Sequence, residues 1–352
     1  MSGGAAPSVA RSTFARHLEA AWSTRGPLVW LLWPLSWVYA LALSSRRLVE
    51  ALGLAQAVRL PVPVVVVGNL VAGGAGKTPA VLAVVDLLRR EGWTPGIVSR
   101  GHGRDDLRPC EVTRSTPARR CGDEPLLLHL RSGAPLQVDL DRPAAGRALL
   151  ARHPQVDILV ADDGLQHRRL ARDAQLIVFD ERGAGNGLLL PAGPLREPMT
   201  PTAPPRSVVV YNAAAPSTAW PGATARRGLA GFTPLADWWR GEWSADAPDW
   251  SGRRLLAVAG IARPDRFFAM LRERGLHFDE LRLPDHHAFE TLPWPTDTDA
   301  VVLTEKDAVK LPPGTALGAT QVWVATLDFR LDPATEQALC RLLPPRGGPA
   351  KD

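Results

Sequence analysis

The chain has 352 residues, of which 45% are hydrophobic, so it can form one large or two ordinary globular domains with real cores. Its formal net charge is +5, and the first sixty residues carry six arginines against two glutamates, so the basic excess is local. The three cysteines have neither the even number nor the clustered spacing of a disulfide framework or a zinc site. Those two classes are excluded, and a reducing compartment is favoured.

The first predicted element is an apolar helix over residues 27–43, which contains Trp30, Trp33 and Trp37 and has arginines on both sides. This length is at the lower limit for a membrane-spanning helix, and Pro34 lies in the middle. Tryptophan mixed with leucine and flanked by arginine favours an amphipathic helix in the headgroup region of an anionic membrane leaflet, not nucleic-acid binding. A true membrane span and a buried core helix are the alternatives.

From residue 61 the pattern alternates between strand and helix. Residues 64–67 form a short apolar strand, a glycine-rich loop follows, and residues 78–90 have helical periodicity. Further buried strands are predicted at 96–99, 158–161, 176–180 and 208–211. The chain is therefore predicted to have an α/β fold, a P-loop NTPase-like α/β/α sandwich with a mostly parallel sheet.

A poorly periodic stretch, residues 213–249, interrupts this series. A second strand and helix series follows, with strands at 255–260, 300–303 and 322–325 and a helix at 264–274. We place a domain boundary near residue 212 and predict three segments. They are a membrane-associating helical segment (1–60), a P-loop core (61–212) and a smaller C-terminal α/β domain that completes the active-site cleft (213–352), whose final segment can pack back on the core.

The glycine-rich loop has the residue types that hold a nucleotide phosphate. Its residues are Gly73, Gly74, Ala75, Gly76, Lys77 and Thr78. Glycines let successive backbone N–H groups turn inward, the lysine reaches the outer phosphates, and the hydroxyl ligates magnesium at a helix N-terminus. The strict GxxxxGK[ST] pattern requires glycine at position 71, where this chain has Val71. A glycine-rich turn without a nucleotide is the alternative interpretation.

Asp162 and Asp163 directly follow the predicted strand 158–161. A P-loop protein needs a carboxylate at the end of a neighbouring strand to organise the magnesium shell. Alone, such a pair is more commonly a helix cap or a turn. Together with the glycine-rich loop it predicts a metal site, so ATP and Mg²⁺ are the expected cofactors.

Longer motifs make the sequence similar to the tetraacyldisaccharide 4′-kinase family of lipid A biosynthesis. In chain order they are VGNLVAGGAGKTP, SRGHGR, GDEPLLL, ADDGLQHRRL and NGLLLPAGPLREP, with TEKDAVK near the C-terminus. The resemblance implies ATP-dependent phosphorylation of the 4′-hydroxyl of a tetraacyl glucosamine disaccharide 1-phosphate. It also implies a peripheral or monotopic protein at the cytoplasmic face of the inner membrane of a Gram-negative bacterium.

The same resemblance implies a role for individual residues. Asp123 matches a catalytic aspartate and His286 the histidine paired with it, with His287 as the alternative. Asp123 is by pattern also a plausible helix N-cap. The resemblance also implies that Lys77 is catalytic. The metal positions that it implies are Thr78, Asp162, Asp163 and Glu197. The remaining implied active-site positions are Glu124, Arg142, Gln166, His167 and Arg196. A sugar hydroxyl is barely acidic, so a base that accepts its proton late in phosphoryl transfer is useful.

The leading hypothesis is a lipid kinase at the membrane surface, with no nucleic acid and no obligate protein partner. The alternative from another class is a membrane-associated P-loop ATPase switch that recruits partners. Its best-known form carries a second lysine where this chain has Ala72. A soluble P-loop synthetase acting on a carboxylic acid is a third reading, which the arginine-flanked apolar N-terminus disfavours.

Overall fold

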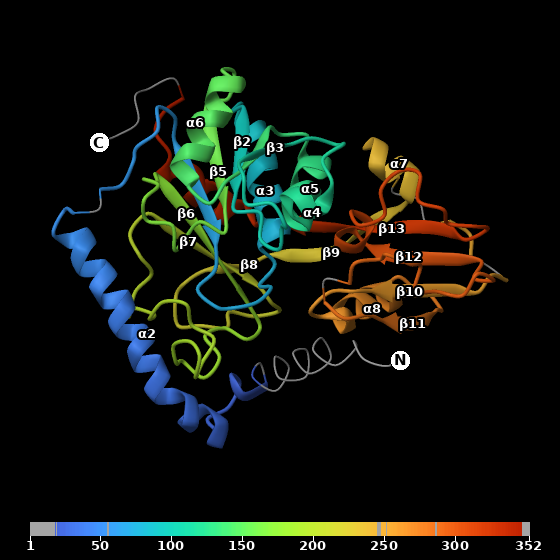
Figure 1. Cartoon of the computed structure of the whole chain (residues 1–352), viewed down its shortest axis with the longest axis horizontal. Helices are drawn as coiled ribbons and strands as arrows, with labels where there is room; N and C mark the ends of the chain where they lie inside the picture. Colours follow the sequence, from blue (N-terminus) through green and yellow to red (C-terminus); the bar gives the residue numbers. More distant parts are fainter. Residues whose placement is uncertain are drawn as a thin grey trace, which may run out of the picture. The chain divides into compact units, whose positions relative to one another are not determined.

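The structure is a computed structural model that describes residues 18–346 except 19, 55, 245–247, 251 and 286. The chain forms two compact units, whose elements are labelled in Figure 1. Unit 1 comprises Met1–Lys77, Asp163–Ala225 and Asp332–Asp352, and unit 2 comprises Thr78–Asp162 and Arg226–Leu331. Two of the unit boundaries therefore fall inside the predicted phosphate and metal motifs, one after Lys77 and one before Asp163.

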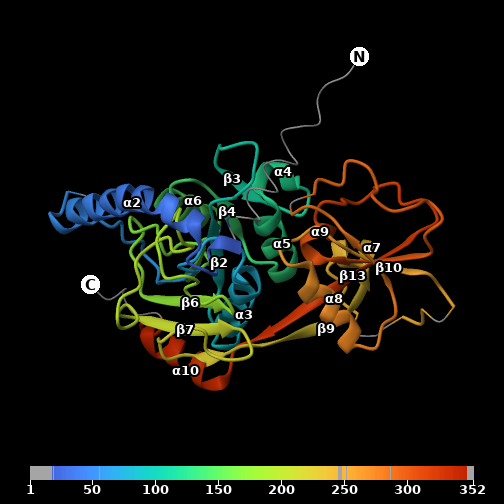
Figure 2. The same ribbon diagram turned by 90° about the horizontal axis from the view of Figure 1, so that it is seen from below.

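The sheet strands of unit 1 are parallel. β1 (Val64–Gly68), β6 (Ala174–Asp180), β7 (Ser207–Asn212) and β8 (Ala223–Thr224) lie side by side in this order. Helix α10 (Pro333–Leu342) packs against β6 and β7, as Figure 2 shows. The strands β1 and β6 are buried along their whole length, which is why they read as continuous apolar runs in the sequence.

The N-terminal helix α2 (Pro27–Ala51) is longer than the predicted apolar segment, because the helical pattern continues through the arginines. Among the described residues it is the one helix long and apolar enough to cross a membrane. Only 11% of its apolar window is buried. Leu31 and Trp37 are 76% and 65% exposed, whereas Val29 and Ser36 are buried. The buried-core alternative is therefore wrong, and the choice between lying in and spanning a membrane stays a prediction.

The first part of unit 2 contains a second set of strands. β3 (Cys110–Val112), β4 (Leu136–Val138), β2 (Pro95–Ser99) and β5 (Ile158–Asp162) lie side by side in this order. All are parallel except β3, which pairs antiparallel with β4. Helix α6 (Arg142–Arg152) packs on β2 and β4.

Three further helices connect these strands. α3 (Lys77–Arg90) follows the glycine-rich loop and buries one apolar face, so the predicted helix 78–90 is confirmed to within one residue. The short α4 (Ala118–Cys121) leads through one glycine into α5 (Asp123–Ser132). Helix α5 therefore starts on the predicted catalytic aspartate.

The second part of unit 2 is a five-stranded sheet. Its order is β11 (Asp279–Arg282), β10 (Leu255–Ala259), β12 (Ala300–Thr304), β13 (Gln321–Arg330) and β9 (Arg226–Pro234). All neighbours are parallel except β9, which pairs antiparallel with β13. β10, β12 and β13 agree with the predicted strands. β11 was not predicted, and β9 lies in the stretch interpreted as poorly periodic.

Three helices accompany the strands of this sheet. They are α7 (Leu235–Arg240), α8 (Pro264–Glu273) and the short α9 (Glu305–Ala308). Phe267, Phe268 and Leu271 of α8 belong to a hydrophobic core with inward residues of β9, β10, β12 and β13. The predicted α/β class with mostly parallel strands is thus confirmed in both units.

Candidate active site

The glycine-rich loop has glycine where its backbone requires it. Gly73 (φ +90) and Gly76 (φ +87) adopt the left-handed region that other residues avoid. A Cβ at Gly76 would collide with Nδ2 of Asn212, the last residue of β7. The same Asn212 Nδ2 donates to the carbonyl of Ala75 at 3.2 Å. The end of β7 therefore supports the loop at the position where only glycine fits.

Lys77 is held at the start of α3 by polar groups of unit 1. Its Nζ lies 3.3 Å from Asn69 Oδ1 and 3.8 Å from Asp163 Oδ1. Asn69, fully buried, also donates from Nδ2 to the carbonyl of Gly73 at 3.4 Å. Asn69 and Asn212 were not among the predicted site residues. Their signal is a polar residue at the carboxyl end of a fully apolar strand.

Asp163 is contacted by two cations of the predicted site, Lys77 and Arg196. Its φ of +47 is uncommon outside glycine and holds the carboxylate just beyond the end of β5. Arg196 NH1 lies 3.1 Å from Oδ1 and 3.0 Å from Oδ2. Gln166 accepts from Arg196 NH1 at 3.5 Å and donates to the carbonyl of Asn69 at 3.2 Å. The structure thus brings together Lys77, Asp163, Gln166 and Arg196.

Glu197 belongs to a separate ionic cluster. Its Oε2 lies 2.7 Å from Arg168 NH2 and 3.3 Å from Arg47 NH2. Arg168 NH1 also contacts Glu50 of α2 at 3.1 Å. The carboxylate predicted as a metal ligand is therefore already neutralised by two guanidinium groups.

Helix α2 is bonded to the segment that carries Arg196. The Tyr39 hydroxyl donates to the carbonyl of Arg196 at 2.9 Å. Burial raises the pKa of Tyr39, so this hydroxyl keeps its proton well above neutral pH. Ser36 Oγ donates to the carbonyl of Leu189 at 2.9 Å and accepts from the N–H of Ala192 at 3.0 Å. The apolar helix therefore fixes the backbone on which a predicted site arginine stands.

In unit 2, polar side chains lie at the carboxyl ends of β2 and β5. Asp162 Oδ2 accepts from Ser99 Oγ at 2.8 Å. Arg142 is 1% exposed and donates to the carbonyls of Asp139 at 2.9 Å and Asp162 at 3.2 Å. Its guanidinium therefore braces the end of β5. Thr78, in the first turn of α3, is also buried.

Asp123 stands at the first position of α5. The N-cap is Gly122, at φ +97, so the alternative in which Asp123 caps this helix is wrong. Lys310 Nζ lies 3.8 Å from Asp123 Oδ2. The next residue, Glu124, forms an ion pair with Lys306. Burial lowers the pKa of Lys306, but the carboxylates of Glu124, Asp285 and Asp123 together outweigh it, so the pKa is raised.

The predicted histidines give less information. His286 lies outside the described residues, so its pairing with the catalytic aspartate stays a prediction. His287 Nδ1 accepts from the N–H of Phe289 at 3.2 Å, and the two rings meet edge to face at 4.9 Å. His287 therefore has a local role in its own turn. His167 offers its backbone carbonyl to Arg172 at 3.0 Å.

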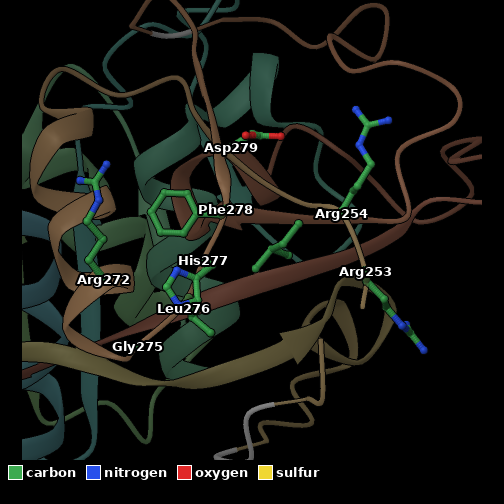
Figure 3. A pocket seen from close by; sticks show the side chains of 9 residues that line it. Arg253, Arg254, Arg272, Gly275, Leu276, His277, Phe278 and Asp279 are labelled. Carbon is green, nitrogen blue, oxygen red and sulfur yellow. The ribbon is translucent and has the colours of Figure 1, made fainter. Parts of the chain in front are cut away.

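A pocket of about 620 Å³ lies at the amino ends of β10 and β11. Figure 3 shows that Arg253, Arg254 and Arg272 point in different directions around Phe278. Of the described predicted site residues, none lines this pocket. Ligands of parallel sheets bind at the carboxyl ends of the strands, where Lys306 follows β12. The pocket is therefore not the candidate active site.

Comparison with known proteins agrees with these motifs. A family model described as tetraacyldisaccharide-1-P 4′-kinase matches residues 28–344. A tetraacyldisaccharide 4′-kinase from Methylibium petroleiphilum is 54% identical over 346 residues, covering 95% of each chain. One from Leptothrix cholodnii is 52% identical over 345 residues, covering 94% of this chain and 97% of the relative.

A solved structure supports the fold. It is a crystal structure from Aquifex aeolicus, described as the apo form of LpxK in complex with ATP, with a TM-score of 0.73 and 23% identity. The alignment covers 90% of this chain and 100% of that one. The family model spans nearly the whole chain and the relatives share about half of its residues, so the chain belongs to the tetraacyldisaccharide 4′-kinase family.

Proposed function

We propose that this chain transfers the γ-phosphate of ATP to the 4′-hydroxyl of a tetraacyl glucosamine disaccharide 1-phosphate. The product is the 1,4′-bisphosphate lipid A precursor, lipid IVA. One observation carries the proposal: the match to the tetraacyldisaccharide-1-P 4′-kinase family runs from residue 28 to 344 and so includes every predicted site residue. The relatives that are 54% and 52% identical bear the name of this enzyme.

The glycine-rich loop binds the ATP phosphates. Backbone N–H groups between Gly73 and Thr78 face the phosphate oxygens, and the Lys77 ammonium neutralises the outer ones. Two features support this assignment, the left-handed glycines and the anchoring of Lys77 by Asn69. Arg196, at 26% exposure, contacts the carboxylate of Asp163, as Lys77 does. Its guanidinium can therefore add a second positive charge when a phosphate enters.

Magnesium accompanies the nucleotide, and Thr78, Asp162 and Asp163 are the residues that would hold it. Mg²⁺ prefers oxygen ligands and takes few of them from protein, since phosphates and water complete its shell. Within the described residues, no three His, Cys, Asp or Glu side chains gather as a metal site. The bound ion supplies charge neutralisation at the phosphates. Glu197 stays a further proposed metal residue, and in this structure its carboxylate contacts Arg47 and Arg168.

Asp123 accepts the proton of the attacking hydroxyl, assisted by His286. Phosphoryl transfer passes through a loose transition state, so the base acts late and positioning contributes most of the rate. The place of Asp123 at the start of α5 supports this role, because the nearby Lys310 ammonium, 3.8 Å from Oδ2, favours the charged carboxylate that a base needs. Glu124 is held by Lys306 beside it.

The acceptor is a lipid, and helix α2 brings the enzyme to it. Its exposed tryptophan and leucine side chains match a surface that enters the headgroup region of a bilayer. Because ATP is cytoplasmic, we place the protein at the cytoplasmic face of the inner membrane, peripheral or monotopic.

The segments 1–60, 61–212 and 213–352 are proposed as the anchor, the P-loop core and the smaller domain. Strand β9 opens the five-stranded sheet at Arg226, soon after the proposed boundary. Helix α10 packs on β6 and β7, so the end of the chain returns to the core.

A transfer assay tests the function directly. Purified protein in detergent with Mg²⁺ and γ-labelled ATP is expected to label the tetraacyl disaccharide 1-phosphate, and chelation of Mg²⁺ to stop it. Lys77→Ala should remove most activity, and Lys77→Arg should not restore it because the larger fork does not fit a tight loop. ATP hydrolysis that is indifferent to the lipid acceptor would instead favour the ATPase switch.

A further inference from the structure

The TEKDAVK motif, residues 304–310, contributes only Lys306 to the proposed function, through its ion pair with Glu124. Thr304 caps α9, because its Oγ1 accepts from the N–H of Asp307 at 3.2 Å. Glu305 forms an ion pair with Arg131, at the far end of α5. The motif therefore fastens α9 to α5, the helix that begins with Asp123.

Asp307 is the buried centre of this motif, with no solvent exposure. Its Oδ2 accepts from the N–H of Gly260 at 3.0 Å and from Thr304 Oγ1 at 2.7 Å. Its Oδ1 accepts from Lys310 Nζ at 3.3 Å. A buried carboxylate that accepts from three donors is tightly oriented, and the Lys310 ammonium lies beside it as a counter-charge.

Lys310 is held from three sides. Its side chain is only 7% exposed. The ammonium lies 3.3 Å from Asp307 Oδ1, 3.8 Å from Asp123 Oδ2 and 5.7 Å from the centroid of the Phe289 ring. A lysine normally keeps many rotamers, but here the carboxylate and the ring fix the ammonium in one place.

We propose that Lys310 is a positioning residue for Asp123, and that Asp307 positions Lys310 in turn. Asp123 stands in the first turn of α5, and its Oδ2 is the carboxylate oxygen that lies near the Lys310 ammonium. The fixed ammonium attracts Oδ2 and so selects the orientation in which Oδ1 faces the acceptor hydroxyl. This inference rests on the proposed role of Asp123 as the base.

A double-mutant cycle tests the inference. Lys310→Met removes the charge at similar length, and Asp123→Asn removes the base. In the transfer assay, Lys310→Met should lower kcat by about tenfold or more, with the KM for ATP unchanged within about twofold. In the Asp123→Asn background the same change should lower the residual kcat by less than about twofold, because the orientation of a lost base no longer matters.

Two comparisons separate positioning from simple loosening. Arg131→Met breaks the neighbouring α5–α9 ion pair without touching Asp123, so it should lower the melting temperature and leave kcat near the wild-type value. Lys310→Arg keeps the positive charge and should recover part of kcat. If Lys310→Met does not fold, Asp307→Asn, which releases Lys310 at equal volume, replaces it in the cycle.

The outcomes are distinguishable from failure of the proposed function. A wild-type protein that transfers no phosphate to the lipid acceptor would overturn that function itself. Wild-type activity together with an unchanged kcat in Lys310→Met would overturn only the inference. An equal loss in the wild-type and Asp123→Asn backgrounds would likewise overturn it, because Lys310 would then act independently of Asp123.

Discussion

In unit 1 the predicted catalytic charges lie in a partly open network, whereas in unit 2 they lie against buried partners. Asp163 and Arg196 are 32% and 26% exposed, and their contacts are ones that an incoming phosphate or metal can replace. Lys310 and Asp307 are 7% and 0% exposed, and they are enclosed beside Asp123. The open contacts of unit 1 can therefore rearrange when a phosphate or metal binds, whereas unit 2 holds the Asp123 carboxylate in a preorganised position.

Exposed and buried ion pairs also differ in how much they contribute to stability. An exposed ion pair contributes about 0–1 kcal/mol because water screens it and two side chains lose freedom. Breaking a buried pair costs about 3–5 kcal/mol, because the remaining charge is left unpaired. Substitutions in unit 1 should therefore act mainly on ligand affinity, and substitutions near Asp123 mainly on turnover.

The largest expected effect is that of Asp123→Ala. Loss of the proposed base should lower kcat by about 100-fold or more while the affinity for ATP stays within about twofold. Steady-state kinetics with ATP and lipid varied in turn measure both values. Asp123→Asn, of nearly equal volume, is the matched variant. If both variants are unfolded at the temperature of the assay, Asp123 has a structural role.

A smaller effect is expected from the outer face of α2. Trp37→Ser with Leu41→Ser removes two exposed apolar side chains, each contributing about 1 kcal/mol when partly immersed in a bilayer, so vesicle binding should weaken by about 30-fold. Flotation with anionic vesicles measures this binding. Ser44→Ala on the same helix is the control. Unchanged flotation would show that another surface carries membrane binding.

Arg196→Met tests the open network of unit 1. It should raise the KM for ATP by about tenfold and change kcat less, because a guanidinium hydrogen bond to a charged group contributes about 1.5–3 kcal/mol. Arg196→Met should thus change mainly KM, whereas Asp123→Ala should change mainly kcat. A variant with low kcat and normal KM would break the distinction between the two units.

Much of this could be predicted from the sequence wherever the signal is local. The strands β1 and β6 are continuous apolar runs, and Lys77 and Asp163 stand in short motifs with a chemical reason for each position. Strand β9 could not be predicted, because its sequence RRGLAGFTP has two glycines and a proline and becomes a strand only by pairing with β13.

The site contacts that were not predicted also join residues that are far apart in the sequence. Tyr39 and Arg196 are 157 residues apart in the chain, so nothing local marks the hydroxyl as a support for the arginine. Lys310 was visible as part of a motif, but its nearness to Asp123 depends on the packing of α9 against α5. Glu197 stands next to Arg196 in sequence, yet its carboxylate contacts Arg47 and Arg168.

The smallest expected effect is that of Tyr39→Phe, which removes one hydrogen bond to the backbone of Arg196. Its net contribution is about 1 kcal/mol, so kcat/KM should fall by about threefold to fivefold while vesicle binding stays unchanged. Measuring both properties on one preparation checks the separation. Loss of vesicle binding in step with activity would show that Tyr39 acts through the membrane instead.

Ser36 has a consequence for protein engineering. Its hydroxyl satisfies both the carbonyl of Leu189 and the N–H of Ala192, so a single small polar residue ties a largely exposed apolar helix to that backbone. A foreign amphipathic helix of equal lipid affinity could replace α2 as an anchor, but it would leave both backbone groups without that partner. Trimming the N-terminus to solubilise the enzyme would therefore also remove a support of the segment that leads to Arg196.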